Sequence, residues 1–261
     1  MAAVRTPAVL LRAHDYGDSS RILRFYTRDH GLVSVVARGV RGRSGKGATT
    51  LASFASGELS AFVKPQRELH TMQDFHCVRI RSGLAGEMLR FAGASAVAEL
   101  VLAHTEQEPQ TAVFDALEGT LDRLEKALAA ELPGTVLAAL WSITEAFGFA
   151  PQLDPCVRCD EPLGHDEIGR FDFAAGGVRC AACGEDAAGA RLGPGARRQL
   201  ESLLSGEVPE GLAHPRRHLA LVSDFMAYHV VSRPLRSLRF LGGLMPPDDA
   251  IGASAGGQAD G

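Results

Sequence analysis

Four cysteines in the second half of the chain constrain its folding more than any other feature. They form two Cys-x-x-Cys pairs, Cys156–Cys159 and Cys180–Cys183, which are separated by 20 residues. Each pair allows two thiolates to reach one ion from a tight turn, and two such turns complete a closed tetrahedral sulfur site with no position left for water. The spacing therefore predicts one structural Zn²⁺ ion held by Cys156, Cys159, Cys180 and Cys183.

The segment around these cysteines is rich in glycine and lacks the long apolar pattern that would fold it unaided. We expect metal binding to supply its folding energy. Two redox-active Cys-x-x-Cys motifs, or a remnant without metal, are the alternatives. A redox motif favours one Cys-x-x-Cys at a helix start after a strand, whereas both pairs lie in a loop-rich segment here. His165 is an alternative ligand within the same segment.

No export or membrane signal is visible in the sequence. Arg5 and Arg12 interrupt the apolar run at the start of the chain, and no cleavable hydrophobic region follows. The longest apolar stretches are far shorter than the roughly 18 residues that span a bilayer. Cysteines in a chain of this kind indicate a reducing compartment, where paired cysteines more often hold metal than form disulfides. Cys77, the odd cysteine, is expected to be a small buried hydrophobe.

Charge is distributed unevenly along a chain of ordinary composition. With 46% hydrophobic and 22% charged residues, the chain is typical of globular proteins, which excludes collagen-like, disordered and disulfide-dense classes. The net charge of −4 hides a basic first third, because residues 1–90 hold 14 Lys and Arg against 7 Asp and Glu. Such clustering favours a module that faces a polyanion, and a charge imbalance that only aids solubility is the alternative.

Short stretches of strand character, separated by turns, fill the first 80 residues. Residues 21–27 and 32–38 flank the turn Asp29–His30–Gly31 and predict a hairpin. Another strand begins at Val9, and residues 57–64 and 68–78 are expected to form two more. Five short strands with a basic excess favour an OB-fold barrel.

The apolar period changes to that of helices after residue 83. We expect a helix around Leu84–Leu102, an amphipathic helix around Val113–Leu128 with acidic outer positions, and further helices at 136–147, 196–204 and 218–231. The fold class is therefore α+β and multidomain. The expected parts are an OB-fold domain at 1–80, a helical domain in two parts at 81–150 and 191–245, an inserted four-cysteine zinc ribbon at 151–190 and a disordered tail at 246–261.

A glycine-rich loop after the third strand carries the densest group of cations. Its members are Arg38, Arg41, Arg43 and Lys46, and Arg21 and Arg24 of the preceding strand extend the group. Glycines let backbone amides approach an anion, and Arg and Lys neutralise phosphates, so these six residues are candidate DNA contacts. A solvated flexible loop is the alternative. The loop fails as a nucleotide P-loop, because Gly47 stands where Ser or Thr would bind magnesium.

Three further features are weaker candidates for binding. Phe62 lies on the polar side of its expected strand, where it can stack on a base or pack against the helical domain, and Tyr26 carries the same two alternatives. Arg233, Arg236 and Arg239 follow one another at steps of three. If the backbone stays helical past Pro234, they gather on one side and can receive an acidic peptide with an apolar tip. A charged solvent face is the alternative.

Catalytic patterns are missing, and the order of the segments points to a family. No nucleophile elbow, HExxH motif or Rossmann glycine pattern occurs, so no enzymatic activity is expected.

The chain resembles the bacterial RecO family over about residues 4–245. The motifs that carry this resemblance are Asp18–Leu23, Thr27–Gly31, Val36–Arg41 and Phe147–Asp154, the last of which leads into Cys156. Some members of the family lack the zinc ligands, whereas this chain has all four.

The resemblance implies a mediator of DNA repair and recombination in the bacterial cytoplasm, associated with the nucleoid. Such proteins bind single- and double-stranded DNA and anneal complementary strands without ATP. They engage the acidic C-terminal tail of single-strand-binding protein, act with RecR and so help to load RecA, and no membrane is involved. Two alternatives remain from the residues alone. One is a zinc-stapled protein-interaction adaptor with no direct DNA role, and the other is a metal-dependent hydrolase or redox enzyme.

Overall fold

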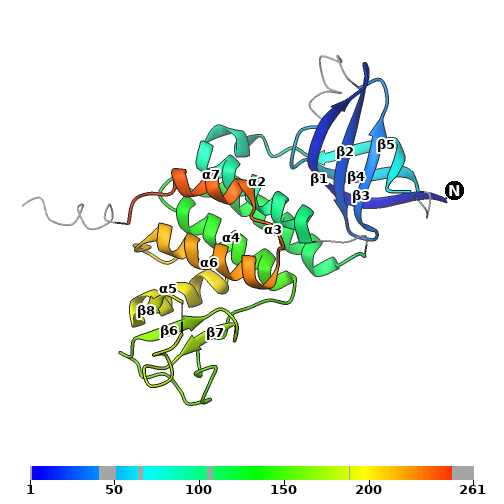
Figure 1. The fold of residues 1–261 in the computed structure, drawn as a ribbon. Coiled ribbons are helices and arrows are strands. Elements are labelled where there is room, and N and C mark those ends of the chain that lie inside the picture. Colours follow the sequence, from blue (N-terminus) through cyan, green and yellow to red (C-terminus); the bar gives the residue numbers. More distant parts are fainter. Residues whose placement is uncertain (1, 41–50, 64–66, 105–107, 188, 249–261) are drawn as a thin grey trace, which may run out of the picture. The chain divides into compact units, whose positions relative to one another are not determined.

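A computed structural model describes residues 2–40, 51–63, 67–104, 108–187 and 189–248 of the chain (Figure 1). The chain forms two compact units, residues 1–126 and 127–261. Three of the candidate DNA contacts, Arg41, Arg43 and Lys46, lie outside the described residues, and so does the expected disordered tail beyond Asp248. The finer domain limits expected from the sequence stay a prediction.

The first unit begins with a closed barrel of five strands, as the sequence predicted (Figure 1). The strands are β1 (Ala2–Tyr16), β2 (Ser20–Thr27), β3 (Gly31–Ala37), β4 (Ser56–Val63) and β5 (Leu69–Arg79). Their order around the barrel is β1-β2-β3-β5-β4. Neighbours pair antiparallel except for β3 and β5, which pair parallel over only three positions.

The core of the barrel follows from the alternation of apolar residues along each strand. In β2, Leu23 and Phe25 are fully buried inside the barrel, and the Phe25 ring lies 4.9 Å from that of Phe75 in β5. Cys77 packs against this core and is half-buried, in line with its expected role as a small hydrophobe. Gly57 of β4 allows β5 to approach closely, because a Cβ atom there would lie 2.1 Å from the carbonyl oxygen of His76.

The barrel is followed in the same unit by a short 3₁₀ helix, η1 (Ser82–Gly86), and by the helices α2 (Met88–His104) and α3 (Thr111–Lys126). The apolar stripe predicted for α3 is buried at Val113, Leu117, Leu121 and Leu124. Leu128 is exposed and lies beyond the end of the helix, so the predicted helix was too long at that end.

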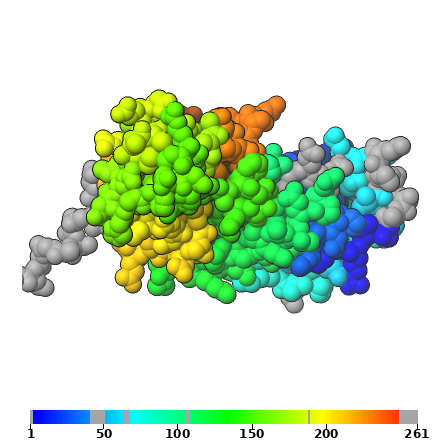
Figure 2. All heavy atoms as spheres, turned by 90° about the horizontal axis from the view of Figure 1, so that it is seen from below, coloured from blue at the N-terminus to red at the C-terminus, as the bar shows by residue number. Residues whose placement is uncertain are grey.

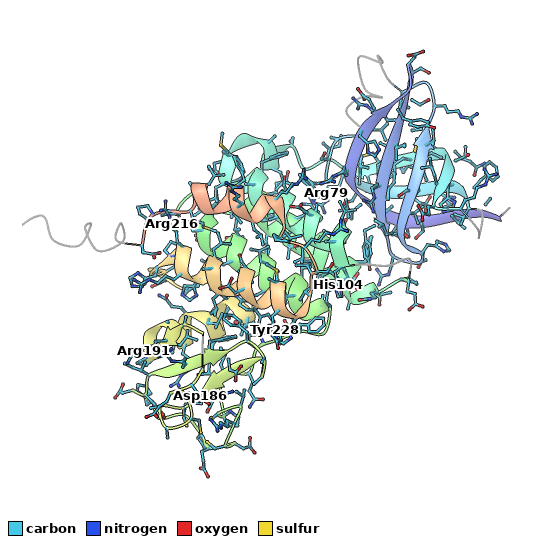
Figure 3. All side chains as sticks on the ribbon, viewed as in Figure 1. Arg79, His104, Asp186, Arg191, Arg216 and Tyr228 are labelled. Atoms are coloured by element: carbon cyan, nitrogen blue, oxygen red, sulfur yellow. The ribbon has the colours of Figure 1, made fainter. Side chains whose placement is uncertain are left out.

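The acidic residues of α3 face the barrel. The sequence had predicted that they would face the solvent. Arg81, which directly follows the end of β5, has a fully buried side chain that pairs with Glu118 at 3.0 Å and with Asp122 at 2.7 Å. Its guanidinium also donates a hydrogen bond to the carbonyl oxygen of Phe54 at 2.7 Å. Arg79, labelled in Figure 3, pairs with Asp122 as well. These carboxylates compensate cations that would otherwise be buried alone.

The second unit contains four helices and a small sheet among its described residues. The helices are α4 (Leu132–Ala146), α5 (Pro194–Leu204), α6 (Pro215–His229) and α7 (Arg236–Leu244). The sheet has the order β7-β6-β8, from β6 (Gly169–Asp172), β7 (Gly177–Arg179) and β8 (Arg191–Leu192). β6 and β7 lie in the segment 151–190, for which the sequence predicted a zinc ribbon, and β8 follows directly after it. Pro133 lies in the first turn of α4, where proline is tolerated, so this helix begins earlier than the predicted residue 136.

Large aromatic side chains form the core of this unit. Trp141 of α4 is fully buried, and its ring lies 5.3 Å from that of Phe225 in α6. Phe171 of β6 meets the same phenylalanine edge-on at 6.1 Å. His229, at the end of α6, donates a hydrogen bond from Nε2 to the carbonyl oxygen of Phe173 at 2.7 Å. The small sheet is thus attached to α6 by stacking and by a hydrogen bond.

His218 in α6 makes the stability of this unit depend on pH. The residue is buried, and its Nε2 atom lies 3.3 Å from Oε1 of Gln199. Burial, and then the charge of His214, lower the pKa of His218 to about 4, although Asp248 acts in the opposite direction. The pKa of histidine in an unfolded chain is about 6.5. The neutral ring therefore contributes stability that is complete above the unfolded pKa and is lost as the pH falls towards 4.

We expect acidification from about pH 7 to about pH 4 to lower the free energy of unfolding by on the order of 3 kcal/mol through His218 alone. The variant His218→Gln should lack this part of the loss, because glutamine does not titrate. Urea unfolding at both pH values measures the difference, with His165→Gln as an exposed control. An equal loss in the His218 variant and the wild type would contradict the assignment.

Candidate metal centre and nucleic-acid interface

Two tight turns bring the four cysteines to one place. In the first turn, the amide of Asp160 donates a hydrogen bond to the carbonyl oxygen of Cys156 at 2.9 Å. In the second, the amide of Cys183 donates to the carbonyl oxygen of Cys180 at 3.2 Å. The amide of Val157 donates to a carbonyl oxygen of β7 at 3.0 Å. The first turn is thereby attached to the strand that leads into the second.

The sulfur atoms are close enough to share one ion. All four Sγ atoms lie within 4.8 Å of one another, and those of Cys159 and Cys180 are 3.8 Å apart. Zinc–sulfur bonds of about 2.3 Å in a tetrahedron place neighbouring sulfurs about 3.8 Å apart. The four residues therefore fit a tetrahedral metal ion, as their spacing predicted. His165 is not part of this cluster, and its exposed ring contacts Asp166 instead.

The surroundings of the four sulfurs favour ionisation of one cysteine, but they oppose ionisation of all four unless a cation is bound. Burial opposes ionisation of Cys156, but the amides of Cys180, Arg158 and Cys159 donate to its sulfur and lower its pKa to about 6. The side chain of Cys180, together with burial, raises the pKa of Cys183 to about 12. A metal ion supplies the positive charge that lets all four thiolates coexist.

An acidic residue beyond the second turn ties the two turns together. Asp186, labelled in Figure 3, pairs with Arg158 at 3.2 Å and with Arg179 at 3.4 Å. Arg158 lies between the cysteines of the first turn, and Arg179 directly precedes the second pair. In the space-filling view, this segment, coloured green to yellow, forms a continuous part of the surface of the second unit (Figure 2).

The described cations predicted to contact DNA all lie on β2 or directly after β3, but their surroundings differ. Arg21 pairs with Asp15 at 3.0 Å, so part of its charge is compensated. Arg24 is half-buried, and Arg38 is exposed just beyond the end of β3. No ion pair joins Arg24 or Arg38 to a carboxylate among the described residues. These two guanidinium groups are available to an anion.

Arg12 is a cation of this surface that the sequence reading missed. It lies directly opposite Arg24 on the neighbouring strand, and its side chain is exposed. A β-bulge between Leu10 and Arg12 breaks the strict alternation of β1. Leu10 therefore points into the core and Arg12 points outward, although they are two residues apart. Strict alternation after Leu10 would place Arg12 inside the barrel. The charge of Arg12 is the one feature of the sequence that argues against this position.

The two aromatic candidates have different outcomes. Tyr26 is 0% exposed, and its hydroxyl donates a hydrogen bond to the carbonyl oxygen of Gln110 at 3.4 Å. Its ring packs within the first unit and does not stack on a base, so of its two alternatives the packing role is correct. Phe62 is half-buried and points away from the barrel core, between Ala3 of β1 and Thr71 of β5.

Two family models match the chain and together span most of it. The model described as Recombination protein O N terminal matches residues 1–81, and the one described as Recombination protein O C terminal matches residues 86–239. The chain belongs to the RecO family. The first match covers the barrel, and the second covers all four cysteines.

Curated relatives of the RecO family agree with this assignment over nearly the whole chain. A protein named DNA repair protein RecO from Anaeromyxobacter dehalogenans strain 2CP-C is 32% identical over 269 residues, covering 98% of this chain and 100% of the relative. The protein of the same name from Anaeromyxobacter sp. strain K is 31% identical and covers 94% and 98%. That from Rubrobacter xylanophilus is 34% identical and covers 72% and 74%. A role in DNA repair and recombination follows from this membership.

The C-terminal basic cluster of this RecO-family chain does not have the geometry that the sequence reading required. The helix α6 ends at His229, and α7 begins only at Arg236, so the backbone is not helical through Pro234. Arg233 therefore lies in the connection, while Arg236 and Arg239 lie on α7. All three arginines are exposed. A single helical row of arginines does not form.

Among the residues that the structure describes, the RecO-family chain has no helix that is both long and apolar enough to cross a membrane.

Proposed function

We propose that this RecO-family chain is a non-enzymatic mediator that binds single- and double-stranded DNA and anneals complementary strands without a nucleotide cofactor. The observation that supports this best is a barrel surface with guanidinium groups that have no carboxylate partner among the described residues, in a chain of a DNA-repair family. Annealing needs cations that screen the repulsion between two sugar-phosphate chains while the base edges stay free. Arginine contacts to phosphates do this and carry no sequence information.

The DNA contacts in this proposal are Arg21, Arg24, Arg38, Arg41, Arg43, Lys46 and Phe62. Arg24 and Arg38 have the clearest support, because no described carboxylate neutralises them. Arg21 is the weakest cation of the group, since Asp15 already occupies one side of its guanidinium. Phe62 is half-buried on the outer face of β4 and can offer part of its ring to a base.

The metal in this proposal is one structural zinc ion. Four thiolates in a tetrahedral arrangement suit zinc, and they leave no open position for a substrate or a reacting water. The ion would hold the two turns together and neutralise the thiolates. In this role it stabilises the fold and does not take part in a reaction.

The proposed partners are RecR, the acidic C-terminal tail of single-strand-binding protein and, indirectly, RecA, which this chain would help to load onto coated DNA in the cytoplasm, close to the nucleoid. An acidic tail requires cations on its receptor. Arg233, Arg236 and Arg239 are exposed in the second unit and are proposed as its contact, with Phe240 exposed beside them for an apolar side chain of the tail.

Fluorescence strand annealing without nucleotide, at two salt concentrations, tests the function. We expect annealing that accelerates with protein and weakens at the higher salt, because bound phosphates release counterions. The slope of log affinity against log salt for single strands should be about 0.7 per phosphate contact. The double variant Arg41→Glu/Arg43→Glu should flatten this slope.

The matched control is Arg191→Glu/Arg198→Glu, which changes two exposed arginines of the second unit by the same charge. Equal slopes for the wild type and the Arg41/Arg43 variant would remove the glycine-rich loop from the site. Absence of DNA binding at low salt, together with capture of RecR that survives high salt, would favour the adaptor function instead.

A further inference from the structure

The barrel keeps two positive charges directly opposite each other on neighbouring strands. Arg12 of β1 pairs in register with Arg24 of β2, and both side chains lie on the outer face. Residues directly opposite in a sheet have Cβ atoms about 5 Å apart, and like charges at such positions destabilise the sheet. Burial, and then the charge of Arg12, lower the pKa of Arg24. The pair therefore costs stability in the free protein.

The strand neighbours of this pair provide no compensating charge. On its other side, Arg24 lies opposite Ser34 of β3. The adjacent outward position of β1 is His14, opposite Ile22 of β2. An anion that is not part of the described chain would convert the repulsion into two favourable contacts.

Other cations of the first unit are treated differently. The following arginines each have a carboxylate partner: Arg5 with Glu58, Arg21 with Asp15, Arg28 with Asp115, Arg79 with Asp122, and Arg81 with Glu118. Arg12, Arg24 and Arg38 have no such partner among the described residues, and Arg12 and Arg24 also lie directly opposite each other. Carboxylates neutralise these five arginines of the unit, but no described carboxylate pairs with Arg12 or Arg24. This difference indicates that Arg12 and Arg24 serve to bind an anion.

A shallow groove of about 170 Å³ lies beside Arg12. Arg12 lines it together with Phe54, Phe91, Ser95 and Glu99, among others. The Phe91 ring is 45% exposed and lies edge-on to that of Phe54 at 5.8 Å. An exposed aromatic ring accepts a nucleobase by stacking. A cation pair next to such a ring suits a nucleotide of a strand better than an isolated inorganic anion.

We infer that Arg12 and Arg24 together bind one phosphodiester group of a DNA strand, and that the adjoining base lies against Phe91 in the groove. This inference rests on the proposed DNA-binding function and deepens it, because it names a phosphate contact that the sequence motifs do not include. The inference also defines the path of the DNA strand, which runs from the outer face of β2 across β1 towards α2.

The first test compares Arg12→Gln with the wild type in binding to oligothymidylate over a series of salt concentrations, and in thermal unfolding. We expect the slope of log affinity against log salt to fall by about 0.7, which corresponds to one lost single-strand phosphate contact. The melting temperature should stay equal or rise, because a like-charge pair has been removed. Weaker DNA binding with undiminished stability is not what a purely structural arginine would give.

The control is Arg5→Gln, a substitution on the same strand at an exposed arginine that already has Glu58 as its partner. It should leave the salt slope unchanged. If Arg12→Gln also leaves the slope unchanged while the wild type binds DNA, the inference is wrong and the proposed function stands. If the wild type itself does not bind oligothymidylate, the proposed function fails.

A second test addresses the base and the source of the phosphate. Phe91→Ala should bind oligothymidylate roughly ten-fold more weakly, within the range for one lost stacked base. The same variant should bind an abasic oligonucleotide as well as the wild type does. Inorganic phosphate at millimolar concentration should not displace the oligonucleotide. Equal losses on both oligonucleotides, or displacement by inorganic phosphate alone, would overturn the assignment of a nucleotide to this groove.

Discussion

Replacement of Cys156 by serine is expected to unfold the segment 151–190 and to abolish metal binding by the four-cysteine cluster. Cys156 is 1% exposed, and its sulfur accepts a hydrogen bond from the amide of Cys180 at 3.2 Å. Structural zinc sites contribute on the order of 10–16 kcal/mol of binding free energy, which the short strands of this segment cannot replace. Because Phe171 packs on Phe225, the loss should also loosen the end of α6.

Metal analysis and hydrogen exchange measure this effect. The wild type should contain about one zinc ion per chain, and the variant should contain none and should lose protection throughout the segment. A chelator should give the same exchange pattern as the substitution. Cys77→Ser is the matched control, because this cysteine lies in the barrel, away from the cluster. A wild type that contains no metal and still protects the segment from exchange would contradict the prediction.

Replacement of Arg81 by methionine should give the second-largest loss, about 3–5 kcal/mol in the free energy of unfolding. The arginine side chain is 0% exposed and pairs with both Glu118 and Asp122. Methionine fills a similar volume but leaves these two carboxylates together without their buried partner. The carbonyl oxygen of Phe54 also loses a hydrogen-bond donor.

Urea unfolding of the intact chain measures this cost, and an exposed ion pair provides the comparison. Arg28 pairs with Asp115 at 3.3 Å, and both side chains are largely exposed. Arg28→Met should therefore cost about 1 kcal/mol or less. The triple variant Arg81→Met/Glu118→Gln/Asp122→Asn should recover part of the stability, because no partly buried carboxylate is left without its cation. Similar losses for Arg81→Met and Arg28→Met would show that burial of the network does not matter.

The four-cysteine cluster was the part of the site that could best be predicted from the sequence. The two Cys-x-x-Cys turns are local structures, and their spacing alone determines that four sulfurs can meet. The five strands were accessible for a similar reason, since alternation and turn residues are read within a few positions of each other. Their order, with β5 inserted between β3 and β4, depends on contacts between distant segments.

The parts that sequence reading missed depend on contacts between distant segments or on breaks in a regular pattern. Glu118 and Asp122 look like solvent-facing acids on a helical wheel, and only the position of Arg81 shows that they face the barrel. Arg12 is hidden by the bulge, which reverses the side on which every later residue of β1 lies. Tyr26 has the alternation of an outer residue, yet it is fully buried, and its hydroxyl donates a hydrogen bond to the carbonyl oxygen of Gln110, directly before α3.

The helical and irregular parts of the second unit show the same limits. The predicted helix 218–231 ended close to the true end of α6 at His229, but the sequence left open whether the backbone stays helical past Pro234. The structure interrupts the helix there and begins α7 at Arg236. The small sheet next to the cysteine pairs has strands of two to four residues, too short for any alternation to be visible. Its formation follows from the position of the two turns, which bring Arg179 and Arg170 opposite each other.

The parallel contact between β3 and β5 gives the barrel an uneven resistance to opening. β1 and β2 pair over eight positions, whereas Ser34, Val35 and Val36 are the only residues of β3 that pair with β5. Parallel pairs are also slightly weaker per residue than antiparallel ones. Thermal fluctuations that open the barrel are therefore expected to begin between β3 and β5, where the sheet can flatten. The longer pairing of β1 with β2, which carries Arg12 and Arg24, keeps its register during such an opening.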